Sequence, residues 1–237
     1  MAGTWEALYK SPTQSVWALV VLPALFLLWL AVRGRRLDGG VEPAAAGFVR
    51  RWAVVFGLVA LVDPIATGPL GWPLLPFVLL GDFRVFLLVL AVMHPTRARG
   101  TVLLEAAAWT LVVPAFAYGT VRLAESVTGP LAPTMLWIVY EIGFVVLVDA
   151  LLVWVIPRRI APDREPVRRY VRAVLGFVVL YYVLWPLADI LALNGEDRGW
   201  ALRMVPNQLY YGLFVPFAYA RFFSAQAASS TSTHAAA

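Results

Sequence analysis

The chain of 237 residues has no cysteine, only two histidines and a single lysine, Lys10. Without cysteine it forms no disulfide and offers no thiolate for catalysis or metal binding. The two histidines, His94 and His234, stand far apart in the sequence, which excludes histidine-clustered zinc or haem sites. We therefore expect neither a metal nor another cofactor.

Charge is also scarce, at 14% of residues, whereas 61% are hydrophobic. Apolar runs of about 18 or more residues are typical of membrane-spanning helices, because about 20 residues cross the hydrocarbon core. The alternation expected of a membrane barrel is absent. The sequence predicts an all-α polytopic membrane protein with seven transmembrane helices, at about 15–32, 52–67, 73–93, 101–121, 134–156, 171–192 and 201–222.

Arginine marks one side of the predicted bundle. If the first connection is cytoplasmic, fourteen of the basic residues lie on that side, and four lie on the other, namely Lys10, Arg122, Arg198 and Arg203. Short cytoplasmic loops retain positive charge, so we expect the N-terminus outside and the C-terminus inside. Arginines beside an anionic lipid surface also explain the net charge of +5 without nucleic acid.

The ends of the chain are expected to differ. Residues 1–15 carry Glu6 and a single basic residue, and no small-residue cleavage site follows, so the first run is interpreted as a span and not as a signal peptide. Residues 224–237 are small and polar and are expected to be a disordered tail. We predict one membrane domain, 1–223, in a plasma membrane of the bacterial type.

Two stretches of the sequence show the same order of features. Each has an arginine cluster between two apolar runs, an acid near the end of the second run, and a Gly-Trp pair before the third: Asp63 with Gly71-Trp72, and Asp189 with Gly199-Trp200. We expect repeats over 15–94 and 134–223 around a connector helix at 101–121. This three-one-three plan makes the repeats parallel. The interfacial preferences of Trp and Arg are the alternative explanation.

Ionisable residues inside predicted spans are candidate site residues, because they are costly in lipid. Counted along the helices, they gather between the midplane and the outer face: Asp63, Asp82, Arg84, Glu141 and Asp189. Glu141 is flanked by apolar residues, which favours a neutral, proton-donating carboxyl group. Alternatives remain for the others. Asp63 and Asp189 could lie at the head groups, and Asp82 and Arg84 could hold the bundle together.

Polar and aromatic side chains accompany these acids. Asn207, Tyr210 and Tyr211 share the last run, Trp185 lies beside Asp189 in sequence, and Tyr140 precedes Glu141. Aromatic rings beside carboxyl groups suit a flat lipophilic ligand or a carbocation, which each ring stabilises by about 0.5–2 kcal/mol. Pro186, Pro206 and Pro216 are expected to interrupt their helices there and to free carbonyl groups.

Three families share a seven-helix, three-one-three plan. The chain is similar in this respect to microbial rhodopsins, but its last run has no lysine for a retinal Schiff base, and to proline-glutamine loop transporters, but it has no Pro-Gln pair. It also resembles the small integral-membrane terpene cyclases of meroterpenoid pathways in Asp63, in Asp82-Phe83 and in Asn207-Gln208-Leu209-Tyr210. The last motif departs from that family, which has a carboxylate where this chain has an amide.

The leading hypothesis is an enzyme that protonates a lipophilic, isoprenoid-like substrate and cyclises or isomerises it without metal. Asp63 or Glu141 would be the general acid, and Asp82, Asn207 or Tyr210 would orient the substrate or deprotonate the cation. Other substrate-binding candidates complete the set: Tyr140, Trp185, Asp189, Tyr211 and Arg84. The expected partners are membrane lipid and this small molecule. A proton-coupled transporter or a receptor is the rival hypothesis, and an accessory membrane subunit is the third.

Overall fold

The computed structural model describes residues 3–33 and 43–234, with side chains for 3–33 and 45–224. The described residues are almost entirely helical and contain no strand. Six of their helices are long and apolar enough to cross a membrane: Thr13–Arg33, Ala45–Thr67, Leu74–Met93, Arg99–Thr128, Thr134–Arg159 and Pro162–Leu193. The predicted class, an all-α membrane protein, is confirmed, and these six helices lie where six of the seven apolar runs were expected.

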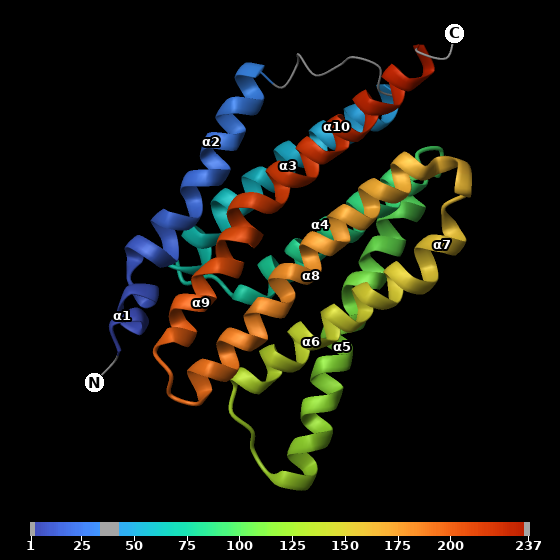
Figure 1. The fold of residues 1–237 in the computed structure, drawn as a ribbon. Coiled ribbons are helices and arrows are strands. Elements are labelled where there is room, and N and C mark those ends of the chain that lie inside the picture. The colour runs from blue at the N-terminus through green and yellow to red at the C-terminus, as the bar shows by residue number, and fades with distance from the viewer. Residues whose placement is uncertain (1–2, 34–42, 235–237) are drawn as a thin grey trace.

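The helices follow one another with short connections (Figure 1). The short helix α1 leads through a π-helical turn, Thr13–Trp17, into α2, and a second π-helical turn, Leu151–Val155, joins α6 to α7. The elements are α1 (Thr4–Lys10), α2 (Ala18–Arg33), α3 (Pro43–Thr67), α4 (Leu74–Met93), α5 (Arg99–Thr128), α6 (Thr134–Ala150), α7 (Ile156–Arg159), α8 (Glu165–Leu193), α9 (Arg198–Asn207) and α10 (Phe214–His234).

The seventh apolar run is one helical segment made of α9, the π-helical turn Gln208–Leu213 and α10. It is not among the six membrane-spanning candidates, since Arg203, Asn207 and Gln208 lower its hydropathy. Its apolar side chains are nevertheless buried, including Phe214 and Phe222. This segment therefore belongs to the bundle, and Arg203, Asn207 and Gln208 are half-buried in it.

Neighbouring helices pack side by side, and the last segment closes the arrangement. α10 contacts α3 and α8, and the turn before it contacts α2. α4 contacts α3, α5 and α8, and most of its second half is buried. The start of α1 and the end of α10 lie at opposite ends of the bundle (Figure 1).

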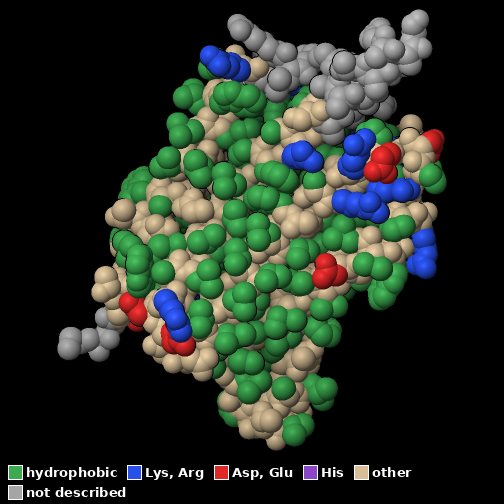
Figure 2. Space-filling model, viewed as in Figure 1, with side chains coloured by type: hydrophobic (Ala, Val, Ile, Leu, Met, Phe, Trp, Pro, Cys, Tyr) green, Lys and Arg blue, Asp and Glu red, His purple; other side chains and the backbone are tan. Residues whose placement is uncertain are grey.

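The surface between the two ends is apolar. Figure 2 shows hydrophobic side chains over most of the visible face, with basic side chains gathered mainly near one end. Large apolar side chains such as Leu28, Leu104 and Val146 are exposed. In water this surface would be unfavourable, whereas in a bilayer it meets hydrocarbon.

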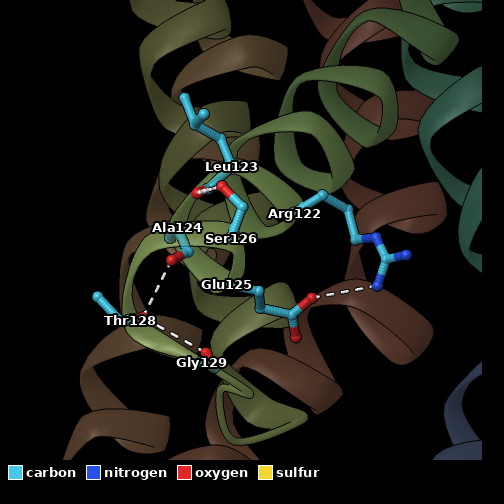
Figure 3. Close-up of polar contacts among 7 residues, drawn as sticks. All are labelled: Arg122, Leu123, Ala124, Glu125, Ser126, Thr128 and Gly129. Carbon is cyan, nitrogen blue, oxygen red and sulfur yellow. Dashed lines mark hydrogen bonds and ion pairs between the residues drawn. The ribbon is translucent and has the colours of Figure 1, made fainter.

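In the last turns of α5, side chains of the helix itself donate hydrogen bonds to its backbone carbonyl groups (Figure 3). The Ser126 hydroxyl donates to the Leu123 carbonyl at 2.7 Å, and the Thr128 hydroxyl donates to the Ala124 carbonyl at 3.0 Å. Gly129 then stops the helix at a φ of 84°, a conformation that favours glycine. The end of α5 thus needs no other element to cap it.

The disorder expected for 224–237 stays a prediction, and α10 is described as far as His234. The sequence after Phe223 contains neither proline nor glycine up to that residue, so nothing in it breaks the helix. Ala235 to Ala237 lie outside the described residues. The parallel repeat stays a prediction.

Candidate functional site

A cavity of about 400 Å³ lies at the end of the bundle where α1 is found, near the start of α6, the end of α8 and α9 (Figure 1). Side chains from five parts of the chain separated in sequence line it. They come from the N-terminal segment, from α4, from α6 and α8, and from α9 with the π-helical turn after it. The fold therefore brings segments far apart in the sequence around one space, at the end of the bundle where α1 lies.

Glu141 is the one carboxyl group among the described residues that line this cavity. It is only 5% exposed, and its Oε2 has no hydrogen-bond partner among the described residues. Its position, in the eighth residue of α6, follows from the helix starting at Thr134. A buried carboxyl group with a free oxygen can donate a proton to a ligand or accept a hydrogen bond from it.

A second acid, Asp189, does not line the cavity but pairs with an arginine that does. Arg203 of α9 lines the cavity and forms an ion pair with Asp189 of α8, whose side chain is fully buried. Glu141 also lies close enough to both residues to interact with their charges. The Arg203 guanidinium group thus lies near two carboxyl groups, those of Asp189 and Glu141. Of these two, only Glu141 lines the cavity.

Asp82 is fully buried in α4 and is bound by two tyrosines. The hydroxyl groups of Tyr140, from α6, and Tyr182, from α8, each donate a hydrogen bond to one of its carboxylate oxygens. Both tyrosines line the cavity, whereas Asp82 does not. The carboxylate therefore fixes three helices together and orients two hydroxyl groups at the cavity wall.

Arg84 holds the π-helical turn in place. Pro206 and Pro216 lack amide hydrogens, and the segment between them widens to π-helical geometry over Gln208–Leu213. Within this turn the Tyr210 carbonyl accepts a hydrogen bond from Arg84 Nη2 at 2.8 Å, and the guanidinium lies 4.3 Å from the Tyr210 ring centroid. Arg84 is 1% exposed and does not line the cavity.

Asp63, near the end of α3, is also buried and lies behind a tyrosine. Thr67 donates to its carboxylate at 3.3 Å, and the Tyr211 side chain lies close enough to interact with it. Tyr211 lines the cavity, but Asp63 does not. The side chains of Asp63 and Asp189 are both buried inside the bundle, and their depth relative to the head groups stays a prediction.

The N-terminal segment forms one wall of the cavity. The Asp197 carboxylate accepts hydrogen bonds from the amides of Trp5 and Glu6, at 3.0 and 2.9 Å, and so caps α1 from another part of the chain. Tyr9 follows in this helix, packs on Trp200 at 5.2 Å and accepts a hydrogen bond from Asn207. α1 thereby brings Tyr9 and Lys10 to the cavity.

The remaining wall is mainly aromatic. Trp185 packs against Tyr182 and Tyr210, with ring centroids 5.3 Å away in both cases, and its indole nitrogen donates to Asn207 at 2.8 Å. Trp137 also lines the space. Such walls surround a flat lipophilic group or a cation with ring faces and edges.

The residues selected from the sequence form two layers around this cavity. Six line it directly, namely Tyr140, Glu141, Trp185, Asn207, Tyr210 and Tyr211. Four lie one residue behind, where each contacts a lining residue: Asp63, Asp82, Arg84 and Asp189. Asp149, eight residues after Glu141 in α6, is exposed and belongs to neither layer.

The sequence interpretation missed Arg203 and the contribution of α1. Arg203 was counted only among the basic residues of the outer side, although it stands four residues before Asn207 and eight before Tyr211, which places all three on one helix face. For α1 the signal was weaker, since Tyr9 and Lys10 precede the first apolar run. Among the residues that the structure describes, no group of three acidic or histidine side chains is placed to hold a metal ion.

Comparisons of the chain with models of protein families, with curated proteins and with solved structures find no match.

Proposed function

We propose that the chain is an integral-membrane enzyme that protonates a lipophilic, isoprenoid-like substrate and cyclises or isomerises it. The observation that carries this proposal is Glu141, a buried carboxyl group with an unpaired oxygen on the wall of an aromatic cavity. A proton donor and rings that stabilise a cation are what an alkene protonation requires. A cavity of about 400 Å³ also lies within the usual range for small-molecule sites.

The proposed reaction conserves atoms. The Glu141 carboxyl group gives its proton to a terminal alkene carbon, and the resulting cation is attacked by a second double bond, which closes a ring. The cation then loses a C–H proton through a tyrosine hydroxyl group, Tyr140 or Tyr182, to the Asp82 carboxylate behind it. Asp82 thus takes the role of base through a tyrosine, and Asp63 becomes a positioning residue behind Tyr211.

The resemblance to meroterpenoid cyclases supports the same proposal. Asn207 and Tyr210 of its last motif line the cavity, and Asp63 and Asp82 of the other two motifs contact lining tyrosines. We further propose that the segment of α9 and α10 is a seventh span, that the N-terminus lies outside, and that the two halves are parallel repeats. The opposite positions of α1 and the end of α10 are those expected of an odd number of spans (Figure 1).

A proton-coupled transporter or a receptor would use the same cavity. A transport path must also be lined at its other end, and beyond Asp82 and Arg84 the interior consists mainly of fully buried apolar side chains such as Val85 and Leu88. This observation favours the enzyme over the transporter. A role as an accessory subunit would not explain why a buried Glu141 oxygen is left without a hydrogen-bond partner among the described residues.

The test uses the full chain in liposomes, a panel of linear polyprenylated phenols and deuterated water. We expect a product of unchanged composition that carries one carbon-bound deuterium. Glu141→Gln should lower its formation by a factor of about 10²–10⁴. Asp149→Asn, on the same helix but exposed, is the matched control and should retain activity. Equal activity of both variants would refute the mechanism, and pH-driven uptake of the panel without turnover would favour the transporter.

A further inference from the structure

A second cavity, of about 180 Å³, lies between the first turns of α3, the end of α4 and the start of α5. It shares no lining residue with the first cavity. One part of its wall is apolar, with Phe48, Leu87 and Leu103, and the other part is basic. The basic part holds Arg51, His94, Arg97 and Arg99.

The positive charge of this wall is only partly neutralised within the described part of the chain. No Asp or Glu lines the cavity, and Arg97 shares Glu105 with Arg159. Arg51 and Arg99 make no hydrogen bond or ion pair with any described residue. Burial, followed by the nearby Arg97 guanidinium, lowers the pKa of His94, as expected where positive charge gathers.

The depth of the cavity is that of a membrane surface. α4 ends at Met93 and α5 begins at Arg99, so the basic residues lie where these two helices leave the apolar layer. Phe48, Leu87 and Leu103 extend from the same cavity along the helices, and Leu103 is 45% exposed. A ligand here meets cations at the level of the head groups and apolar side chains on the hydrocarbon side.

We propose that this cavity binds an anionic phospholipid, with its phosphate between Arg51 and Arg99 and an acyl chain along Phe48, Leu87 and Leu103. Guanidinium groups match phosphate oxygens in charge and in geometry. The apolar wall selects the lipid over free phosphate, which would gain nothing from it. This site is independent of the proposed enzyme activity.

The test measures binding of short-chain phosphatidylglycerol and phosphatidylcholine to the full chain in detergent by native mass spectrometry. The double variant Arg51→Gln with Arg99→Gln should lose at least tenfold in affinity for phosphatidylglycerol. The matched control is Arg172→Gln with Arg221→Gln, which removes two arginines that are equally exposed and unpaired among the described residues but lie outside the cavity. It should stay within twofold of the native chain.

Two further arms separate a lipid site from a phosphate site. Ala91 lines the cavity, so Ala91→Phe should fill part of it and weaken phosphatidylglycerol binding without any change of charge. Inorganic phosphate at matched ionic strength should not displace the lipid. Displacement by phosphate, or equal losses in the two double variants, would overturn the proposal, and the arginine pair keeps the test decisive if Ala91→Phe does not fold.

Discussion

The two ends of the bundle carry their charges in opposite ways. At the end near α1, acidic side chains lie inside, as with Asp63, Asp82, Glu141 and Asp189. At the other end the charged side chains, among them Arg51, lie mainly outside. Burying a charged group in a membrane bundle costs free energy, whereas an arginine at the surface meets anionic lipid at little cost.

This difference separates two tasks within one bundle. The arginine-rich end contributes apolar packing inside, with Leu88, Val174 and Leu175 fully buried, and mainly exposed arginines outside. The end near α1 gives up some packing for a cavity and for hydrogen-bonded carboxyl groups around it. We expect mutations that remove buried polar partners to act most strongly there.

The largest effect is expected when Asp82 loses both of its partners. Tyr140→Phe combined with Tyr182→Phe leaves the carboxyl group buried without hydrogen-bond donors, and we expect a loss of about 2–3 kcal/mol in the free energy of unfolding. The measurement is unfolding in mixed detergent micelles, followed by circular dichroism. A buried carboxyl group can take up a proton, which limits the cost.

The control for this pair lies at the other end. Tyr170 is also buried, but its hydroxyl group donates only to the Ala218 carbonyl, at 3.2 Å. Tyr170→Phe should cost about 0.6 kcal/mol, the usual value for one hydrogen bond between membrane helices. If this single change destabilises the chain as much as the double one, the ends do not differ as described.

A smaller effect is expected from the close approach of α4 to the π-helical turn. A Cβ atom on Gly81 would lie 1.5 Å from the Tyr210 hydroxyl oxygen, so Gly81→Ala must displace that ring. We expect a loss of about 1–2 kcal/mol in the free energy of unfolding, from overpacking. Gly176→Ala in α8 meets no atom within 4 Å and should cause no loss. The same unfolding measurement compares the two, and equal stability of both variants would show that Tyr210 yields freely.

The sequence predicted six of the helices well, because the length and hydropathy of each apolar run indicate a span. Thr134–Arg159, for example, begins at the expected residue and extends three residues beyond its expected end. The last segment, from α9 to α10, was the exception, because its hydropathy is too low for it to count among the six spans. Arg203, Asn207 and Gln208 lower its hydropathy. These side chains are half-buried in the bundle, which composition alone does not reveal.

The sequence predicted how far along its helix each site residue lies, but not the direction in which its side chain points. Counting residues from a helix end places Asp63, Asp82 and Glu141 in the outer half or near the midplane, because the rise per residue is constant. Which of them borders the cavity depends on how each helix is rotated and on its neighbours. Asp82 points to Tyr140 and Tyr182, whereas Glu141 reaches the cavity wall. That rotation is set by packing between helices far apart in the sequence.

The smallest effect tests how α1 closes the cavity. Asp197→Ala removes the carboxylate that caps the Trp5 and Glu6 amides, and we expect α1 to lose about 1 kcal/mol, the usual cost of a lost cap. Hydrogen–deuterium exchange in residues 4–10 should then quicken by about fivefold, since 1 kcal/mol corresponds to that factor. Exchange in α4 should not change.

The matched control for α1 removes another acid near a helix end. Glu125 pairs with Arg122 at 3.3 Å on an exposed face of α5 (Figure 3), and such pairs contribute little. Glu125→Gln should leave exchange in both α1 and α5 nearly as it is in the native chain. Unchanged exchange of α1 in Asp197→Ala would mean that the contacts of Tyr9 with Trp200 and Asn207 hold this helix without its cap. In that case α1 is a fixed wall of the cavity, and ligands must enter from another side.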